Sequence, residues 1–203
     1  QLNVSVTKNI LNAVKDFSMD TRILLIGSAA EYGLISKKQC PVDENAKLNP
    51  CNIYGLTKIY QKYLMDYYVN SFNLDIVMAR PFNLYGKGIS EKLFIGKIYG
   101  EIKKLKLGLS EEISLGNLES ERDYISIDDA IKHYIKIMKS GKRGEVYNVG
   151  TGVPVKTGDI LKRILEEESV DIKFVKSGQR SEQANDSDKI YANIAKLEGL
   201  YDE

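Results

Sequence analysis

The sequence predicts an α/β fold that consists of a parallel sheet and a smaller second α/β unit. Two short runs, residues 22–27 and Leu74–Ala79, are almost wholly apolar, as is typical of strands buried on both faces. An amphipathic helical pattern precedes each run, and this alternation of helix and strand predicts βαβ units. Because the later elements are shorter and more polar, we expect residues 1–80 to form one domain. Residues 81–203 then form mainly a second domain, with segments of about 120–150 returning to the sheet.

The elements of the first half follow from apolar spacing and from helix-breaking residues. Val4–Phe17 carries apolar side chains at helical spacing, and the first strand follows it. Ser36–Asn52 is polar and proline-rich, which predicts a loop. A helix over Tyr54–Val69 then leads to the strand Leu74–Ala79, and Pro81 is expected to stop that strand.

The second half contains shorter predicted elements. Helices are expected at Phe94–Leu107, Asp128–Met138, Thr157–Glu168 and Ser187–Leu197, and strands at Ile113–Leu115, Asp123–Ile127, Glu145–Val149 and Asp171–Val175. Asp128, Thr157 and Ser187 are the expected N-caps, because their side-chain oxygens can accept hydrogen bonds from the first backbone amides of a helix.

Composition and charge exclude several classes of protein. The 203 residues are 43% hydrophobic and 28% charged, which is ordinary for a globular chain. Since 29 basic and 28 acidic residues nearly cancel, we expect no nucleic-acid partner, and no apolar run is long enough to predict a membrane span. Cys40 and Cys51 form neither a disulfide framework nor a metal pattern, so we expect no metal and a cytoplasmic location. His133 is expected to be structural or exposed to solvent.

Tyr54 and Lys58 form the clearest chemical signal, because they lie four residues apart on one face of a predicted helix. An ammonium group one turn away from a phenol favours the phenolate and brings a tyrosine pKa closer to neutral pH, where acid–base catalysis is efficient. Ser28 directly follows the first buried strand, and ligands of open α/β sheets bind beyond the carboxyl ends of strands. The structural alternatives are a tyrosine packed under a lysine stem and a serine in a turn.

Further blocks accompany this Ser–Tyr–Lys set along nearly the whole chain. They are Asn3-Val, GSAAEYG around Ser28, RPFNLYGKG from Arg80, LGNLESERDYISIDD from Leu115, EVYNVGTG from Glu145, and the stretch from Arg180 through KLEGL. Together they resemble the extended short-chain dehydrogenases/reductases that act on nucleotide sugars as epimerases, dehydratases or reductases. The resemblance implies a partial Rossmann-type dinucleotide-binding domain over 1–80 and a sugar-nucleotide-binding domain over 81–203.

The same resemblance implies roles for individual residues. Ser28, Tyr54 and Lys58 would be catalytic, with Lys58 holding the nicotinamide ribose. The expected residues of the NAD or NADP site are Asn3, Ser28, Tyr54, Lys58 and Pro81, and those of the sugar-nucleotide site are Ser28, Asn83, Arg122 and Arg180. Arginine suits a diphosphate because its planar fork matches phosphate oxygens. Surface ion pairs and a turn are the alternatives for the arginines and Asn83.

Two departures from the family pattern bear on the reaction. The family's dehydratases carry an acidic residue two positions after the catalytic serine or threonine, where this chain has Ala30 with Glu31 one position later. Dehydration is therefore disfavoured. The LGNLES-ERD segment resembles the branch of GDP-mannose dehydratases and GDP-4-keto-6-deoxymannose reductases, so NAD(P)-dependent reduction of a 4-keto GDP-sugar is the leading hypothesis. A 4-epimerase of UDP- or dTDP-hexoses is the alternative.

The second departure is that the family's phosphate loop, G-X-X-G-X-X-G, does not occur in this sequence. Gly150 and Gly152 fit a turn after a late strand instead. We expect the chain to cover about the C-terminal two thirds of a typical member, and a non-catalytic, truncated sugar-nucleotide-binding fragment is the alternative from another class. Because the family often dimerises through its Tyr-X-X-X-Lys helix, we expect a homodimer. Its tyrosines, Tyr60, Tyr63, Tyr67 and Tyr68, could serve that interface or the core.

Overall fold

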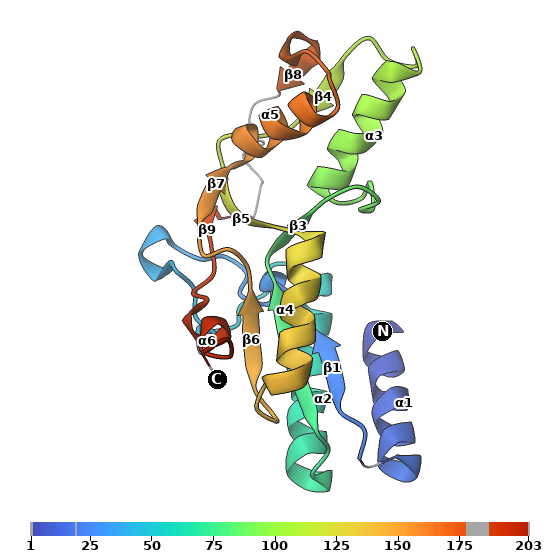
Figure 1. Cartoon of the computed structure of the whole chain (residues 1–203), viewed down its shortest axis with the longest axis vertical. Coiled ribbons are helices and arrows are strands. Elements are labelled where there is room, and N and C mark those ends of the chain that lie inside the picture. Colours follow the sequence, from blue (N-terminus) through green and yellow to red (C-terminus); the bar gives the residue numbers. More distant parts are fainter. Residues whose placement is uncertain (1, 19, 178–186, 203) are drawn as a thin grey trace.

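A three-stranded parallel sheet in the order β1–β2–β6 lies in the lower half of the molecule, as Figure 1 shows for this computed structural model. The structure describes residues 2–18, 20–177 and 187–202. The strands are β1 (Ile23–Ile26), β2 (Ile76–Pro81) and β6 (Val146–Val149). Every residue of β2 is buried, in agreement with the apolar run that predicted it. Pro81 was expected to stop this strand after Ala79, but it is itself the last residue of β2.

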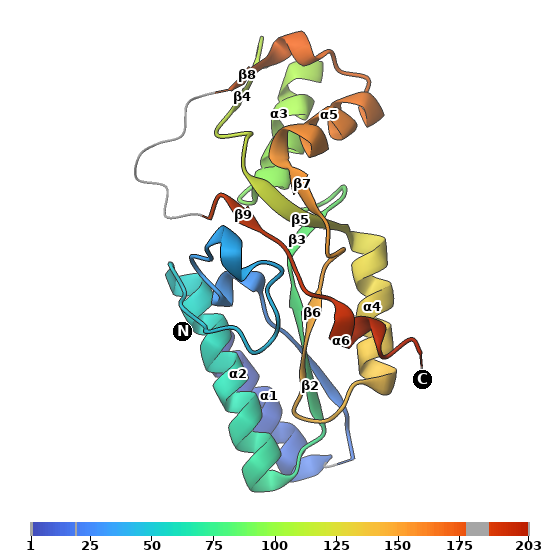
Figure 2. The ribbon, with the colours of Figure 1, turned by 90° about the vertical axis from the view of Figure 1, so that its left-hand side faces the viewer.

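Helices cover both faces of this sheet. Helices α1 (Leu2–Phe17) and α2 (Ile53–Phe72) lie side by side on one face, and α4 (Ile127–Ser140) with the short α6 (Ala195–Glu198) lies on the other (Figure 2). Alternate residues of β2 pack against the helices on opposite faces of the sheet. Ile76 and Met78 pack with α1 and α2, whereas Val77 and Ala79 pack with α4 and α6, as the two-residue period of a strand requires.

The second unit contains two small groups of strands. β5 (Glu121–Ser126) pairs in parallel with β3 (Asn83–Tyr85) and β9 (Lys189–Ile190), and antiparallel with β7 (Pro154–Lys156). β4 (Ile113–Leu115) and β8 (Val175–Ser177) form a parallel pair. Helices α3 (Phe94–Lys106) and α5 (Thr157–Glu167) pack with them around a separate apolar core. Short 3-10 helices occur at Ala29–Glu31, Lys37–Gln39 and Ile172–Phe174.

The helix predicted over Ser187–Leu197 is wrong. Ile190 and Ala192 are both buried against the sheet end, so this stretch follows the two-residue period of an extended strand. Ser187 is no N-cap either, because its Oγ accepts a hydrogen bond from the backbone of Ile35. The helical stretch α6 is confined to four residues.

Three smaller predictions also need correction. Ser126, not Asp128, caps α4, since its Oγ accepts from the Asp129 amide at 3.1 Å. Thr157 is the first residue of α5, and its hydroxyl donates to the Ser120 carbonyl rather than capping the helix. A strand was predicted at Asp171–Val175. Instead, Ile172–Phe174 is a 3-10 turn capped by Asp171, and the strand β8 begins only after it.

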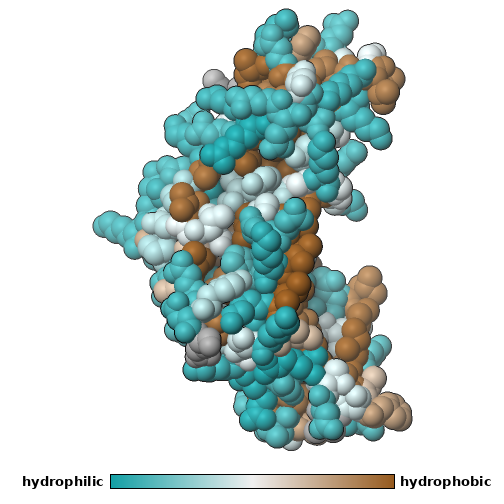
Figure 3. Space-filling view, viewed as in Figure 1, coloured by the Kyte–Doolittle hydropathy of each residue, from teal (hydrophilic) through white to brown (hydrophobic). Residues whose placement is uncertain are grey.

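Exposed apolar side chains gather along α1 and α4 on the face shown in Figure 3. They include Val6 and Ile10 on α1, and Ile131 and Ile135 on α4. No helix within residues 2–18, 20–177 and 187–202 is long and apolar enough to cross a membrane. His133 is half-buried and its Nδ1 lies 2.9 Å from the Tyr201 hydroxyl, so it has a structural partner.

Candidate active site

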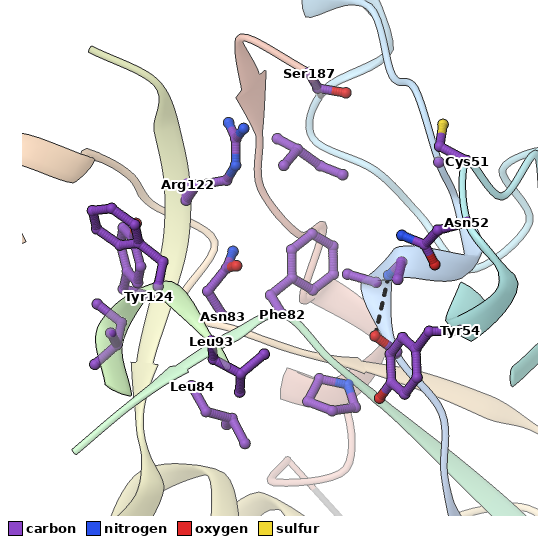
Figure 4. Close-up of a pocket in the computed structure, with 18 residues that line it drawn as sticks. Cys51, Asn52, Tyr54, Phe82, Asn83, Leu84, Leu93, Arg122, Tyr124 and Ser187 are labelled. Atoms are coloured by element: carbon purple, nitrogen blue, oxygen red, sulfur yellow. Dashed lines mark hydrogen bonds between the residues drawn. The ribbon is translucent and has the colours of Figure 1, made fainter. Parts of the chain in front are cut away.

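A pocket of about 430 Å³ opens beyond the carboxyl ends of β1 and β2 (Figure 4). Its volume lies within the range of small-molecule sites. One side is formed by Ser28, Ala30 and Tyr54, and the facing side by Asn83 and Arg122. The chain thus brings together five residues from the end of β1, the start of α2, β3 and β5. This is the position at which open parallel sheets bind ligands.

Ser28 lies two residues after the end of β1 and caps the 3-10 helix Ala29–Glu31. Its backbone is extended, and its Oγ accepts a hydrogen bond from the Ala30 amide at 3.2 Å. Since that contact uses a lone pair, the Ser28 hydroxyl proton remains available for donation into the pocket. The turn is closed from behind by Glu31, whose Oε1 accepts from the Ser28 amide at 2.8 Å. Serine as N-cap and glutamate three residues later form a capping box.

Tyr54 is placed by the start of α2. The Asn52 side chain caps the helix by accepting from the Gly55 amide at 2.8 Å. A Cβ at Gly55 would lie 2.4 Å from the Ala30 carbonyl oxygen, so only glycine allows the helix to approach the Ser28 turn this closely. As a result, the Tyr54 side chain lies at the pocket rim and is 51% exposed. The sequence-predicted pair Ser28 and Tyr54 therefore lines one pocket (Figure 4).

Lys58 lies one turn further along α2. Its Nζ donates to the Ile26 carbonyl at 2.8 Å and lies 5.6 Å from the centre of the Tyr54 ring. Burial lowers the pKa of Lys58, and the nearby Glu31 carboxylate opposes that effect. The ammonium is thus fixed between the end of β1 and the tyrosine, as the spacing of four residues predicted.

Two of the predicted substrate residues, Asn83 and Arg122, lie across the pocket from Tyr54 (Figure 4). Asn83, at the start of β3, donates from Nδ2 to the Asp123 carbonyl at 3.1 Å. Arg122 is 7% exposed, and its Nη1 donates to the Glu121 carbonyl at 2.9 Å. Arg180, which was also predicted to bind substrate, lies outside the described residues.

The two remaining cofactor predictions fall in different places. Pro81 lines the pocket at the end of β2. Asn3 lies in the first turn of α1, and its Nδ2 donates to the Thr57 hydroxyl at 3.4 Å. Its contact is therefore with the residue that precedes Lys58.

Behind the pocket lies a buried polar network that the sequence did not reveal. Glu31 Oε2 accepts from Nε and Nη2 of Arg80 at 3.0 and 2.8 Å, and these side chains are 0% and 1% exposed. Arg80 Nη1 donates to the Tyr32 hydroxyl at 2.8 Å, which in turn donates to Asn148 Oδ1 at 2.6 Å. Burial raises the pKa of Tyr32 to about 12, so its hydroxyl stays protonated. The network joins the Ser28 turn to β2 and β6.

A second buried carboxylate holds the side of the pocket that carries Asn83 and Arg122. Asp123 is fully buried and accepts four hydrogen bonds, from the Thr151 amide and hydroxyl and from the amides of Gly152 and Ala192. It therefore ties β5, next to Arg122, to the turn after β6 and to the segment after β9. A Cβ at Gly150 would lie 2.4 Å from Asp123 Oδ2, so this turn requires glycine.

Comparison with known proteins agrees with this architecture. The family model described as GDP-mannose 4,6-dehydratase matches residues 1–199. The chain belongs to this family. The α/β fold with a partial Rossmann-type parallel sheet, predicted from the sequence, is confirmed. A solved structure of RMD from Pseudomonas aeruginosa, complexed with NADPH, superposes with a TM-score of 0.86 over 98% of this chain and 65% of that chain, at 23% identity.

Two curated relatives are similar over most of this chain. The GDP-6-deoxy-D-mannose reductase of Pseudomonas aeruginosa is 26% identical over 185 residues, which are 91% of this chain and 61% of that protein. A putative UDP-glucose 4-epimerase of Methanocaldococcus jannaschii is 27% identical over 205 residues, covering 98% of this chain and 63% of that protein. The chain thus spans about three fifths of the length of these relatives.

Proposed function

We propose that the chain provides the proton-transfer and substrate-binding part of an NAD(P)-dependent reductase that acts on a 4-keto nucleotide sugar. The observation that carries this proposal is the convergence of Ser28 and Tyr54 on one side of a pocket and of Asn83 and Arg122 on the other. The similarity to a GDP-6-deoxy-D-mannose reductase favours a GDP-sugar as the substrate.

In this mechanism the chain's own groups bind the sugar and move one proton. The Ser28 hydroxyl donates a hydrogen bond to the substrate carbonyl, and Tyr54 transfers its phenolic proton to the same oxygen as charge develops there. The Lys58 ammonium, held by the Ile26 carbonyl, stabilises the phenolate that remains. Arg122 and Asn83 bind the diphosphate through N–H donors. Arg180 would add a second guanidinium.

The residues at the end of β1 fit the nicotinamide end of NAD or NADP, which supplies the hydride when bound. An ammonium has three N–H groups, and Lys58 uses one on the Ile26 carbonyl, so two can bind ribose hydroxyls. Tyr54, Ser28 and Pro81 would complete this end, with Asn3 supporting α2 through Thr57. In the described chain β1 pairs with β2 alone. We propose that the other edge of β1 adjoins the part of the family's fold that carries the glycine-rich phosphate loop.

Reduction is a better match for this pocket than dehydration. Ala30 lines the pocket where a dehydratase needs an acid, and it has no group that could remove a proton. Glu31, the next residue, is 0% exposed and paired with Arg80 behind the turn. A 4-epimerase remains the second candidate, favoured by the similarity to the putative UDP-glucose 4-epimerase.

We also propose that α2 forms a homodimer contact. Tyr60, Tyr63 and Tyr67 are about half exposed along one face of the helix, whereas Tyr68 is buried in the core. Tyr68 thus packs in the core, and the three exposed tyrosines are the ones proposed for the interface. A Tyr63→Lys variant should convert a dimer to a monomer in light scattering, whereas an unchanged mass would contradict this interface.

The cytoplasmic location stays a prediction from the sequence.

The test of function uses the protein as its gene encodes it, with GDP-4-keto-6-deoxymannose and NADH or NADPH. A reductase consumes one NAD(P)H per sugar reduced, read as loss of NAD(P)H absorbance. A 4-epimerase instead interconverts UDP-hexoses with no net change in that absorbance. Binding of the GDP-sugar without either reaction would contradict catalysis and support the non-catalytic alternative.

A further inference from the structure

Glu31 is a buried carboxylate that the proton transfer described above does not use, yet it touches the catalytic turn. Its neighbours Ala29 and Ala30 line the pocket, whereas Glu31 points into the core. Oε1 accepts from the Ser28 amide, and Oε2 accepts two hydrogen bonds from Arg80. The carboxylate is therefore satisfied entirely from behind the pocket.

The surroundings of Glu31 hold this geometry rigidly. A buried charge is tolerated when it is paired and hydrogen-bonded, and Arg80 provides both. Arg80 is held in turn by the Tyr32 hydroxyl, and its guanidinium carbon lies 4.7 Å from the centre of the Tyr32 ring. At Gly27 a Cβ would lie 2.5 Å from Glu31 Oε1. The strand end thus leaves just enough room for the carboxylate to reach the Ser28 amide.

The same carboxylate acts on Lys58. The Lys58 ammonium is bonded to the Ile26 carbonyl, two residues before Ser28, so the ammonium and the Ser28 amide that bonds to Glu31 lie at the same strand end. Tyr54 lies beside Lys58 on the same helix, and Arg80 lies behind Glu31. The negative charge of Glu31 favours the protonated form of Lys58, against the effect of burial.

We propose that Glu31 is a positioning residue for the proton transfer: it fixes the Ser28 turn through the backbone amide and supports the charge of Lys58. It is not a general base. This inference rests on the proposed reductase function for its kinetic consequences. Its structural part, the contact between Glu31 and the Ser28 amide, can be tested without turnover.

The kinetic test compares Glu31→Gln with the double variant Glu31→Gln/Arg80→Gln in the reductase assay. Glu31→Gln keeps the shape and the acceptor for Ser28 but removes the charge. The double variant removes both charges, so no buried arginine is left unpaired. Both should lower kcat at least tenfold while KM for the GDP-sugar stays within threefold. In Glu31→Gln the alkaline limb of the kcat–pH profile should move to lower pH, because Lys58 loses the anion that favours its protonated form. Glu145→Gln, which alters an exposed carboxylate paired with Lys196, is the matched control with unchanged kcat.

Several results would overturn the assignment. A double variant that turns over like the wild type shows that the pair is not needed for catalysis. A rise in KM with unchanged kcat shows that Glu31 acts on substrate binding instead. Failure of both variants to fold makes the pair a requirement of the fold alone and also overturns the proposal.

Hydrogen exchange separates this inference from the proposed function. In Glu31→Ala the Ser28 amide loses its acceptor and should exchange at least tenfold faster than in the wild type. An unchanged exchange rate contradicts the positioning contact. If the wild type oxidises no NAD(P)H, the reductase proposal fails, whereas the exchange result still decides whether Glu31 holds the Ser28 turn.

Discussion

Replacing Tyr32 by phenylalanine tests the buried network that supports the Ser28 turn. The Tyr32 hydroxyl is fully buried, accepts from Arg80 at 2.8 Å and donates to Asn148 at 2.6 Å. Tyr32→Phe keeps the ring against Phe82 and removes both hydrogen bonds. A hydrogen bond to a charged group contributes about 1.5–3 kcal/mol and a neutral one about 1 kcal/mol. We therefore expect the free energy of unfolding to fall by about 3 kcal/mol.

Urea unfolding at several pH values measures this loss and its origin. Because burial raises the pKa of Tyr32 to about 12, the unfolded chain loses the phenolic proton near pH ~10, while the folded chain keeps it. Between the two pKa values the wild type should therefore lose about 1.4 kcal/mol of stability per pH unit through this group, and the loss stops above the folded pKa of about 12. Tyr32→Phe lacks the group, so the difference between the two proteins should shrink as pH rises. If Tyr32→Phe lowers the free energy of unfolding by less than about 1 kcal/mol at neutral pH, the two hydrogen bonds do not stabilise the fold as proposed. A difference in stability that does not change with pH would likewise contradict the raised pKa of Tyr32.

Three further predictions concern the substrate side of the pocket. Asp123→Asn should lower the free energy of unfolding in urea by about 2–3 kcal/mol, since an amide cannot accept all four hydrogen bonds that Asp123 receives; an unchanged midpoint contradicts this. Gly150→Ala should cost about 1–3 kcal/mol through its clash with Asp123, whereas Gly116→Ala, where a Cβ meets nothing within 4 Å, should stay close to the wild type in the same titration. Arg122→Met should weaken GDP binding at least tenfold by calorimetry while leaving the melting temperature within a few degrees. Equal affinity would remove Arg122 from the proposed diphosphate site.

Local sequence patterns predicted the elements whose own apolar spacing shows where they form. The apolar runs correspond to β1 and β2, and the helices α1, α2, α3 and α5 lie within a few residues of their predicted ranges. The short strands β3, β7 and β9 were missed because their own residues show no strand pattern. Each forms because β5 offers backbone partners, and this pairing brings together segments far apart in the sequence.

The candidate site divides in the same way. Ser28, Tyr54 and Lys58 were predictable, because a strand end and a four-residue helical spacing can be seen locally. The pair of Glu31 and Arg80 was not, since the two residues are 49 positions apart and nothing near Glu31 indicates that it faces inward. Asp123 was likewise hidden, because its four donors come from the turn after β6 and the segment after β9.

The turnover of Tyr54→Phe with a 4-keto GDP-sugar and NAD(P)H shows whether Tyr54 donates the proton in the proposed reduction. Tyr54 lies across the pocket from Asn83 and Arg122 (Figure 4), so the variant should bind GDP with wild-type affinity. Loss of the phenolic proton should reduce NAD(P)H oxidation at least a hundredfold. Wild-type turnover in Tyr54→Phe would contradict the account.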